Sequence, residues 1–152
     1  MSSAPIAYVG WGMSAKPFGT GRCLCGAITF TVAAAPVTMG QCHCKDCQRA
    51  TGTGHISNAR FRCEDVSVSG ETKTFSVTAD SGNINTRHFC ATCGSRLFSE
   101  NSARSGFLNV HAGVFDDHTW FEPQWIFYKK AQPQWDITTE DVPCHDKNPA
   151  PK

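Results

Sequence analysis

Apolar and polar residues alternate along much of the chain, with the two-residue period that is typical of a β-strand with one buried face. Ile28, Phe30 and Val32 fall on one side of the stretch "AITFTVA", and residues 65–69 and 74–78 repeat the pattern. Turn residues separate these segments at Ser69-Gly70 and at "ADSGN", and the short apolar runs "FLNV" and "WIFY" predict further strands. We therefore expect a mainly β protein.

Helix is expected to be minor. No window of ten or more residues shows a convincing helical period, and the sequence predicts about one helical turn, after Cys44. The chain of 152 residues has no Pro/Gly/Ser-rich linker and no change of composition, which favours a single domain. Its first 18 or so residues and the tail "CHDKNPAPK" are rich in Pro, small and polar residues, so we expect both to be loosely ordered and to carry no chemistry.

The composition indicates that something other than apolar burial supports the fold. Leu, Ile, Val and Phe make up 28 of 152 residues, about 18%, which is low for a globular domain. Charged residues are also only 18%, which argues against disorder. The nine cysteines offer the missing stabilisation, because metal binding supplies folding free energy when the unfolded chain has no preformed site.

Charge and hydropathy exclude several partner classes. The formal net charge is +1 and the lysines and arginines are scattered, so there is no basic stripe for nucleic acid. The N-terminal stretch lacks the apolar core of a signal peptide, and a run of about 18 apolar residues occurs nowhere, so we expect a cytoplasmic protein with no membrane partner. In that reducing compartment, clustered cysteines are metal ligands more often than disulfides.

Two cysteine pairs share a pattern. "CGAITF" at 25–30 and "CGSRLF" at 93–98 both begin with Cys-Gly, and each has a partner thiol just before it. We expect two metal knuckles that lead into strands, with Gly26 and Gly94 at positive φ so that backbone N–H groups turn toward a sulfur; two unrelated glycine turns are the alternative. The four thiolates have the composition of a closed structural zinc site. The predicted ligands are Cys23, Cys25, Cys90 and Cys93.

The remaining cluster, "CHCKDC" at 42–47, holds three thiolates, those of Cys42, Cys44 and Cys47. Three protein ligands and one open position are typical of a catalytic zinc site. The alternative is a second structural site, and an iron–sulfur cluster also fits the ligand count, although its usual spacings differ. The fourth ligand of a structural site would be one of His43, His55, Cys63 and Cys144. We expect the His43 side chain to point away from the metal in an extended chain, and the Cys63 side chain to be small and buried in a strand.

These motifs resemble the glutathione-dependent formaldehyde-activating enzymes, whose domain is shared with centromere protein V and whose fold is similar to Mss4. The resemblance runs through "GRCLCGAITF", "QCHCKDCQRATG", "RHFCATCGSRLF", "NVHAGVFDD" and "PQWIFYKKAQPQWDI" and covers residues 20–143, leaving an extension at 1–19 and a tail at 144–152. It implies an Mss4-like tent or sandwich of antiparallel strands around two zinc ions. One ion would be structural, on the four paired cysteines, and one catalytic, on the three-cysteine cluster.

The activity that the resemblance implies is that of a carbon–sulfur lyase or synthase. Glutathione adds to formaldehyde and gives S-hydroxymethylglutathione, so the partners would be a small-molecule thiol and an aldehyde. The sequence departs from the family at Trp125, where members often carry a histidine after the proline that resembles Pro123. A non-catalytic zinc-binding structural or interaction module is the main alternative, and a redox sensor built on the three-cysteine cluster is a weaker one.

Addition of a thiol to an aldehyde generates an alkoxide, which needs a proton or hydrogen-bond donor. The sequence does not single out one catalytic residue, and the candidates are His55, His88 and His111, with Asp116 as an orienting group.

Cations are expected near the thiolates, with Arg49 first and Lys45 next, because three thiolates around zinc carry a net negative charge. Four further arginines are too many to choose among: Arg60, Arg62, Arg87 and Arg96. We expect the aromatic residues near the C-terminus to be mostly core, with some rings forming a wall of the zinc pocket. They are Phe115, Trp120, Phe121, Trp125, Phe127 and Trp135.

Overall fold

The structure, a computed structural model, describes residues 16–138 and 141–149. Within these residues the chain forms eleven β-strands, one α-helix and three short 3₁₀ helices, which confirms the prediction of a mainly β protein. The strands are β1 (Gly19–Arg22), β2 (Thr29–Val32), β3 (Thr38–Cys42), β4 (Ile56–Arg62), β5 (Val66–Ser69), β6 (Thr72–Thr78), β7 (Ile84–Cys90), β8 (Arg96–Asn101), β9 (Phe107–His111), β10 (Ile126–Phe127) and β11 (Cys144–His145). The helices are α1 (Lys45–Thr51), η1 (Cys63–Asp65), η2 (Ala112–Val114) and η3 (Lys129–Ala131).

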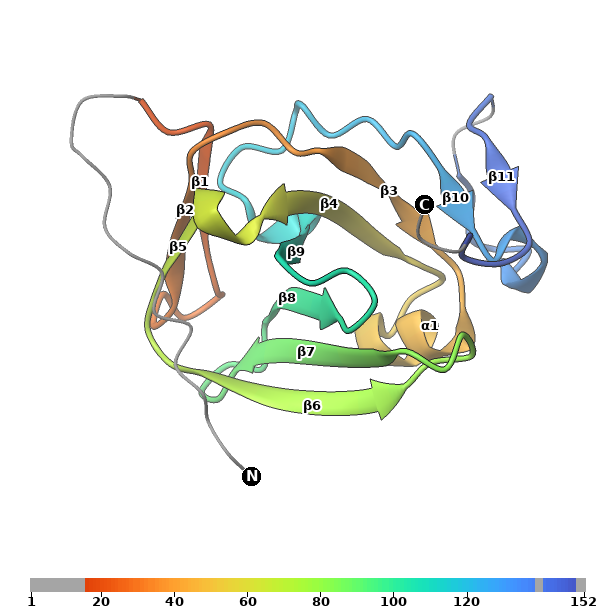
Figure 1. The fold of residues 1–152 in the computed structure, drawn as a ribbon, viewed down its shortest axis with the longest axis horizontal. Helices are drawn as coiled ribbons and strands as arrows, with labels where there is room; N and C mark the ends of the chain where they lie inside the picture. The colour runs from red at the N-terminus through yellow and green to blue at the C-terminus, as the bar shows by residue number, and fades with distance from the viewer. Residues whose placement is uncertain (1–15, 139–140, 150–152) are drawn as a thin grey trace.

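The strands form two sheets. One has the order β1-β2-β5, and the other has the order β11-β10-β3-β4-β9-β8-β7-β6. Figure 1 shows β1, β2 and β5 together at one end of the molecule and β10 with β11 at the other. Most pairs are antiparallel, as expected, and β10 alone runs parallel to its two neighbours, β3 and β11.

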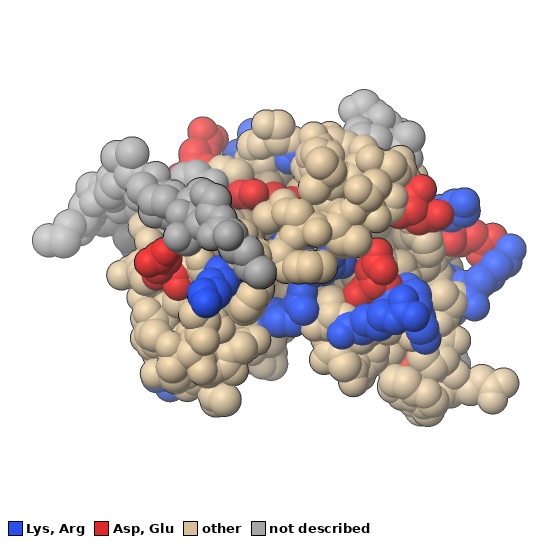
Figure 2. Space-filling model, turned by 90° about the horizontal axis from the view of Figure 1, so that it is seen from below, with Lys and Arg blue, Asp and Glu red and all other residues tan. Residues whose placement is uncertain are grey.

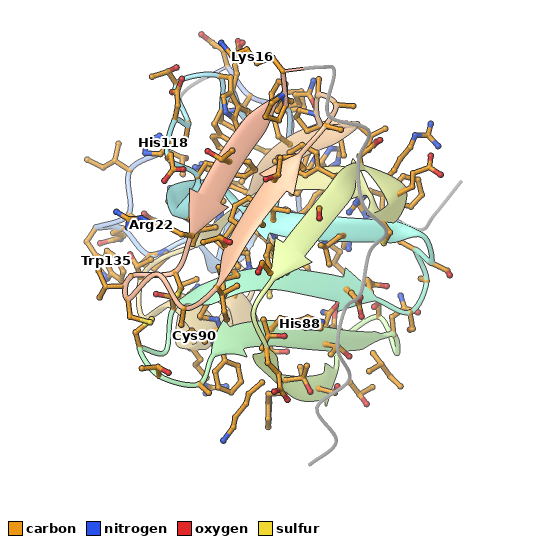
Figure 3. The ribbon with its side chains drawn as sticks, turned by 90° about the vertical axis from the view of Figure 1, so that its left-hand side faces the viewer. Lys16, Arg22, His88, Cys90, His118 and Trp135 are labelled. Atoms are coloured by element: carbon orange, nitrogen blue, oxygen red, sulfur yellow. The ribbon has the colours of Figure 1, made fainter. Side chains whose placement is uncertain are left out.

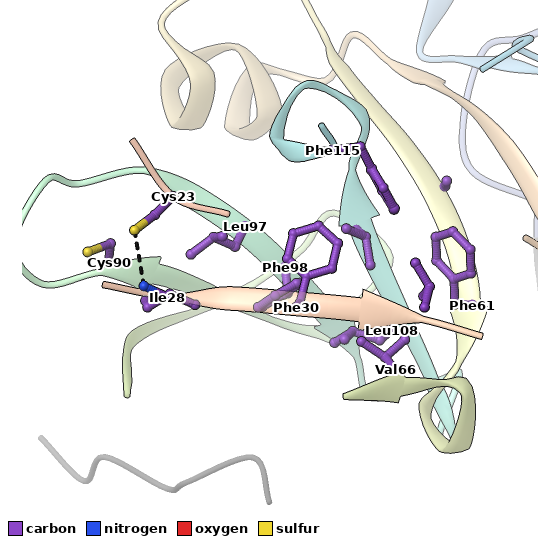
Figure 4. Packing of buried hydrophobic residues seen from close by; sticks show 13 residues of the cluster. Cys23, Ile28, Phe30, Phe61, Val66, Cys90, Leu97, Phe98, Leu108 and Phe115 are labelled. Carbon is purple, nitrogen blue, oxygen red and sulfur yellow. Dashed lines mark hydrogen bonds between the residues drawn. The ribbon is translucent and has the colours of Figure 1, made fainter. Parts of the chain in front are cut away.

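The hydrophobic core joins the two sheets. Phe30 of β2 packs edge-on against Phe98 of β8, with ring centroids 5.3 Å apart, and against Phe115, at 5.0 Å (Figure 4). Ile28, Phe30 and Val32 are all buried, as their alternation predicted. Because these inward residues come from alternate strand positions, the positions between them face the other way.

Two sequence predictions differ from the structure. Residues 72–78 do form a strand, but β6 lies at an edge of the larger sheet and Phe75 is 62% exposed, so this apolar side is not part of the core. Cys63 is half-buried in the 3₁₀ helix η1 rather than buried in a strand.

The single short helix follows Cys44, as predicted. Cys44 is its N-cap residue, and the Cys44 side chain accepts a hydrogen bond from the Cys47 backbone N–H at 3.4 Å. Gly52 ends the helix in the left-handed conformation at φ 73°, where a glycine avoids the Cβ penalty.

The C-terminal tail is more structured than expected, because Cys144–His145 pairs with β10. On the face shown in Figure 2, lysines and arginines lie among acidic side chains rather than in one basic patch. No helix in the described part of the chain is long and apolar enough to cross a membrane.

Candidate metal centres

The two predicted knuckles meet in space. Cys23 and Cys25 lie in the loop after β1, Cys90 ends β7, and Cys93 follows in the turn before β8. Figure 3 shows Cys90 at the end of β7, close to the loop that connects β1 with β2. The Sγ atoms of Cys23 and Cys25 are 3.5 Å apart, and those of Cys25 and Cys90 are 3.7 Å apart. Tetrahedral zinc with Zn–S bonds of about 2.3 Å places its sulfurs about 3.8 Å apart, so this group could hold zinc.

Backbone groups turn toward these sulfurs. Gly26 and Gly94 have φ of 79° and 73°, as predicted, and the Ile28 N–H donates to Cys23 Sγ at 3.3 Å (Figure 4). Hydrogen bonding between Cys93 and the side chain and backbone of Ser95 lowers the pKa of Cys93 to about 5. The thiolate form that a metal needs is therefore favoured there.

The second group is compact and has three members. Cys42 ends β3, Cys44 caps α1, and Cys47 lies in the first turn of α1. Their sulfurs lie within 4.8 Å of one another, and no other Cys, His, Asp or Glu of the described residues joins them. The four residues considered as a fourth ligand, His43, His55, Cys63 and Cys144, thus lie outside this group. All nine cysteines are in the described part of the chain, and none forms a disulfide.

Crowding sets the charge of the three thiols. Hydrogen bonds with Cys42 and Cys47 lower the pKa of Cys44, whereas contact with Cys44 and Cys47, together with burial, raises the pKa of Cys42. The bond with Cys42 lowers the pKa of Cys47, but Cys44 and burial raise it to about 12. Each ionised thiol thus opposes ionisation of its neighbours, and a divalent ion would allow all three thiols to ionise.

A pocket opens beside this cluster. Arg60, Asn109, Ser99 and Arg87 form one row across β4, β9, β8 and β7, each opposite the next in the strand register. All four line the pocket, and so do Cys42 and Cys47. The other lining residues are Ile56, Asn58, Asn85, Asn101, Arg104, Trp125, Phe127 and Asn148. None of these described lining residues is acidic, so the pocket suits an anion.

The strand alternation explains this polar surface. On β4, Ala59 and Phe61 are buried in the core, while Asn58 and Arg60, at the alternate positions, face the pocket. Burial, and then the charge of Arg104, lowers the pKa of Arg60 to about 10, which leaves Arg60 a cation at neutral pH. The buried Asn58 Oδ1 has no hydrogen-bond partner among the described residues and is free to accept one from a ligand.

Trp125 and Phe127 form the apolar wall of the pocket, as expected of some of the aromatic residues. Their rings stack with centroids 4.0 Å apart, and Trp125 Nε1 donates to Thr38 Oγ1 at 2.9 Å. Gly40 lies under the Trp125 ring, where a Cβ atom would overlap it. Phe115 and Trp120 pack in or against the core, whereas Trp135 is 68% exposed.

The predicted proton donors lie elsewhere. His88 Nδ1 is 3.1 Å from Thr72 Oγ1, His55 contacts Asp136, and the exposed Asp116 accepts from Thr20 Oγ1 at 2.7 Å. The buried His111 lies opposite Asn58 in the register of β4 and β9. Its Nδ1 donates to the Arg96 carbonyl at 3.2 Å. None of the three histidines is among the residues that line the pocket.

The two cations expected beside the thiolates, Arg49 and Lys45, do not line the cysteine pocket. Arg49 is exposed at the end of α1, in a separate hollow with Arg87 and Arg96, and Lys45 is exposed with Nζ 3.4 Å from Gln48 Oε1. Buried Arg87 lines the cysteine pocket, and its charge acts to lower the pKa of Cys47. Asn148 also lines the pocket, although no chemistry was expected in the tail.

Residues 19–131 match the family model described as glutathione-dependent formaldehyde-activating enzyme. The chain belongs to this family. No curated protein matches it. A crystal structure of a Rhodobacter sphaeroides protein is similar over 82% of this chain and 98% of that one, with a TM-score of 0.54 and 18% sequence identity, which shows a shared fold. The two cysteine groups could hold metal ions, which is compatible with membership of this family.

Proposed function

We propose that the protein joins a small thiol, with glutathione as the leading candidate, to an aldehyde, with formaldehyde as the leading candidate. The observation that carries the proposal is the group of three cysteines with no fourth protein ligand in the described chain, opening on a pocket with three arginines and no acidic residue. Glutathione has two carboxylates and a thiol, so its charge complements this pocket.

Two zinc ions per chain are part of the proposal. Cys23, Cys25, Cys90 and Cys93 would hold a structural ion, and Cys42, Cys44 and Cys47 a second ion with one open position. When bound there, zinc would keep a substrate thiol deprotonated at neutral pH and fix its position. Ionisation alone is a modest gain, since a thiol of pKa about 8.5 is already a few per cent thiolate at pH 7.

Orientation therefore has to supply much of the acceleration. Arg60 and Arg87 bind the carboxylates of the thiol, and the free Asn58 Oδ1 accepts from one of its N–H groups. Trp125 and Phe127 exclude water from one side of the reacting atoms. These contacts hold the sulfur against the aldehyde carbon.

The reaction balances without a further reactant. The sulfur forms a bond to the aldehyde carbon, the C=O π bond breaks, and the proton released from the thiol ends on the new hydroxyl. Arginine, asparagine and serine side chains line the pocket and can hydrogen-bond the developing oxyanion, whereas the three candidate histidines lie outside it. The cytoplasm would keep the seven ligand thiols reduced.

Native mass spectrometry with glutathione and with glutathione diethyl ester tests the proposal. We expect glutathione to bind the zinc-loaded protein, the ester to bind more weakly, and Arg87→Gln to reduce the difference between them. Formaldehyde should then give S-hydroxymethylglutathione faster than in a protein-free solution, as measured by NMR. Two zinc ions without any bound thiol would favour the non-catalytic zinc module instead.

A further inference from the structure

A third group of metal-binding side chains lies outside both cysteine sites. It consists of His43, His55 and Asp136, whose donor atoms lie within 4.8 Å of one another. Asp136 Oδ2 is 3.0 Å from His43 Nε2 and 2.7 Å from His55 Nδ1. His43 is fully buried, Asp136 is 9% exposed and His55 is 20% exposed, so the group is enclosed but open to solvent at His55.

The His43 ring nitrogens lack hydrogen-bond partners in the described part of the protein. Both ring nitrogens of His43 are buried and have no hydrogen-bond partner among the described residues, although Nε2 lies 3.0 Å from Asp136 Oδ2. A buried polar atom without a hydrogen-bond partner destabilises the folded protein. A cation between the two side chains would satisfy the nitrogen and the carboxylate together.

The position of His43 is fixed on both sides. Its backbone N–H donates to the Phe127 carbonyl at 3.0 Å, and its carbonyl accepts from Gln48 Nε2 at 2.7 Å. Cys42 and Cys44, its neighbours in sequence, belong to the other donor group, so the His43 side chain points away from the three-cysteine cluster, as expected. Gly54 makes room for the carboxylate, because a Cβ atom there would overlap Asp136.

Gln41 can set the tautomer of His55 that a metal requires. Gln41 Nε2 is 3.1 Å from His55 Nε2, while the buried Gln41 Oε1 has no partner among the described residues. Turning this amide by 180° brings the oxygen to His55, where it accepts the Nε2 proton. His55 Nδ1 then keeps its lone pair for a metal, the usual arrangement in which a ligating histidine donates its other N–H to a neighbour.

The geometry points to a third metal site, in which His43 Nε2, His55 Nδ1 and Asp136 bind a divalent first-row transition ion of the zinc type. Two imidazoles and one carboxylate are a donor set of zinc and of non-haem iron(II), and they leave further positions open. Magnesium and calcium prefer all-oxygen ligands. A metal-free His–Asp–His hydrogen-bond network is the competing description.

Cobalt(II) separates the two descriptions, because thiolate-bound cobalt gives intense charge-transfer bands that cobalt bound by imidazole and carboxylate lacks. Full-length protein with both cysteine sites filled is titrated with further cobalt and the bound metal is counted. We expect three ions per chain, the third adding weak d–d bands and no thiolate charge-transfer intensity. Saturation at two ions, or a third ion that adds thiolate intensity, would overturn the proposal.

Two variants test whether the third ion binds at this group. His55→Ala and Asp136→Asn should each lower the affinity for the third cobalt by about 100-fold or more and leave the thiolate bands unchanged. His118→Ala, at an exposed histidine outside the group, is the control and should keep three ions. Full affinity in both variants would place the ion elsewhere. Glutathione binding is measured separately, so its failure alone would count against the proposed reaction and not against this site.

Discussion

Cys44 has two roles at the scale of the single residue. It belongs to the three-cysteine group, and its sulfur also caps the first turn of α1 by accepting from the Cys47 N–H. Serine is among the preferred N-cap residues, whereas alanine is not. Cys44→Ser thus removes a proposed metal ligand but keeps a helix cap, and Cys44→Ala removes both.

We predict that Cys44→Ser abolishes the proposed thiol addition and lowers the zinc content by about one ion, without unfolding the protein. Cys44→Ala should lower the free energy of unfolding by about 1 kcal/mol more than Cys44→Ser. Metal analysis, NMR assay and urea unfolding of both variants check this. Loss of both ions with global unfolding in Cys44→Ser would contradict the separate roles proposed for the two sites.

His111 gives stability a pH dependence. Burial, followed by the charge of Arg96, lowers the pKa of His111 to about 4, against about 6.5 in an unfolded chain. Between these values the unfolded chain binds a proton that the native protein does not, so stability falls as pH decreases from about 6.5 to 4. At pH 7 both states are neutral, and this loss is absent.

We predict that His111→Gln removes this contribution. The unfolding free energy of the unaltered protein should fall more steeply than that of the variant between pH 6.5 and 4, by up to about 1.4 kcal/mol per pH unit. Urea unfolding at several pH values measures the difference, in which metal loss common to both proteins cancels. Parallel curves would show that His111 does not titrate in this way.

At the scale of elements, the packing of β3 against Trp125 shapes the pocket. Gly40→Ala should push the Trp125 ring off β3, lower the free energy of unfolding by about 1–3 kcal/mol, and weaken thiol binding. Gly113→Ala is the matched control, since a Cβ at Gly113 would meet nothing within 4 Å. Urea unfolding and native mass spectrometry check both variants. Equal behaviour of the two would mean that Trp125 moves aside without cost.

Strand alternation made part of this site predictable. It correctly placed Ile28, Phe30 and Val32 in the core, and applied to β4 it also separates Asn58 and Arg60 from the buried Ala59 and Phe61. The sequence alone could not show which arginines line the pocket. Their positions depend on the pairing register of β7, β8 and β9, which no local sequence pattern contains.

Long-range contacts limit prediction further. Cys42, Cys44 and Cys47 are close in sequence, so their meeting could be expected from spacing alone, and the shared Cys-Gly pattern indicated that the two knuckles belong together. Asp136 meets His55 across 81 positions, and Asn148 reaches the pocket from the tail, so neither could be chosen from neighbours in sequence. The alternation also suggested a buried position for Phe75, which is in fact exposed, because alternation does not tell which strand lies at the edge of a sheet.

For the whole molecule, the four-cysteine group connects the loop after β1 to the turn after β7, and Cys23 and Cys90 are part of the core. Apparent zinc binding energies of about 10–16 kcal/mol in small zinc domains match or exceed the usual stability of a domain, about 5–15 kcal/mol. Removing metal from this group should therefore unfold much of the chain, whereas the three-cysteine group is peripheral to the core.

We predict that a chelator removes zinc in two phases. The first ion should leave the three-cysteine group with little change in circular dichroism, and the second should leave with cooperative loss of β-structure. A zinc-binding dye and circular dichroism followed together measure the two events. Release of both ions in one step, or release of both with the β-structure retained, would contradict the structural role proposed for the four-cysteine group alone.

The three donor groups differ in the sequence separation between their members. Cys42 and Cys47 are 5 positions apart, Cys25 and Cys90 are 65 apart, and His55 and Asp136 are 81 apart. During synthesis on the ribosome, the three-cysteine group is therefore complete before the others, at a stage when the rest of the pocket beside it has not yet been made. The C-terminal segment, which carries Asp136 and Asn148, completes the histidine group and the pocket last.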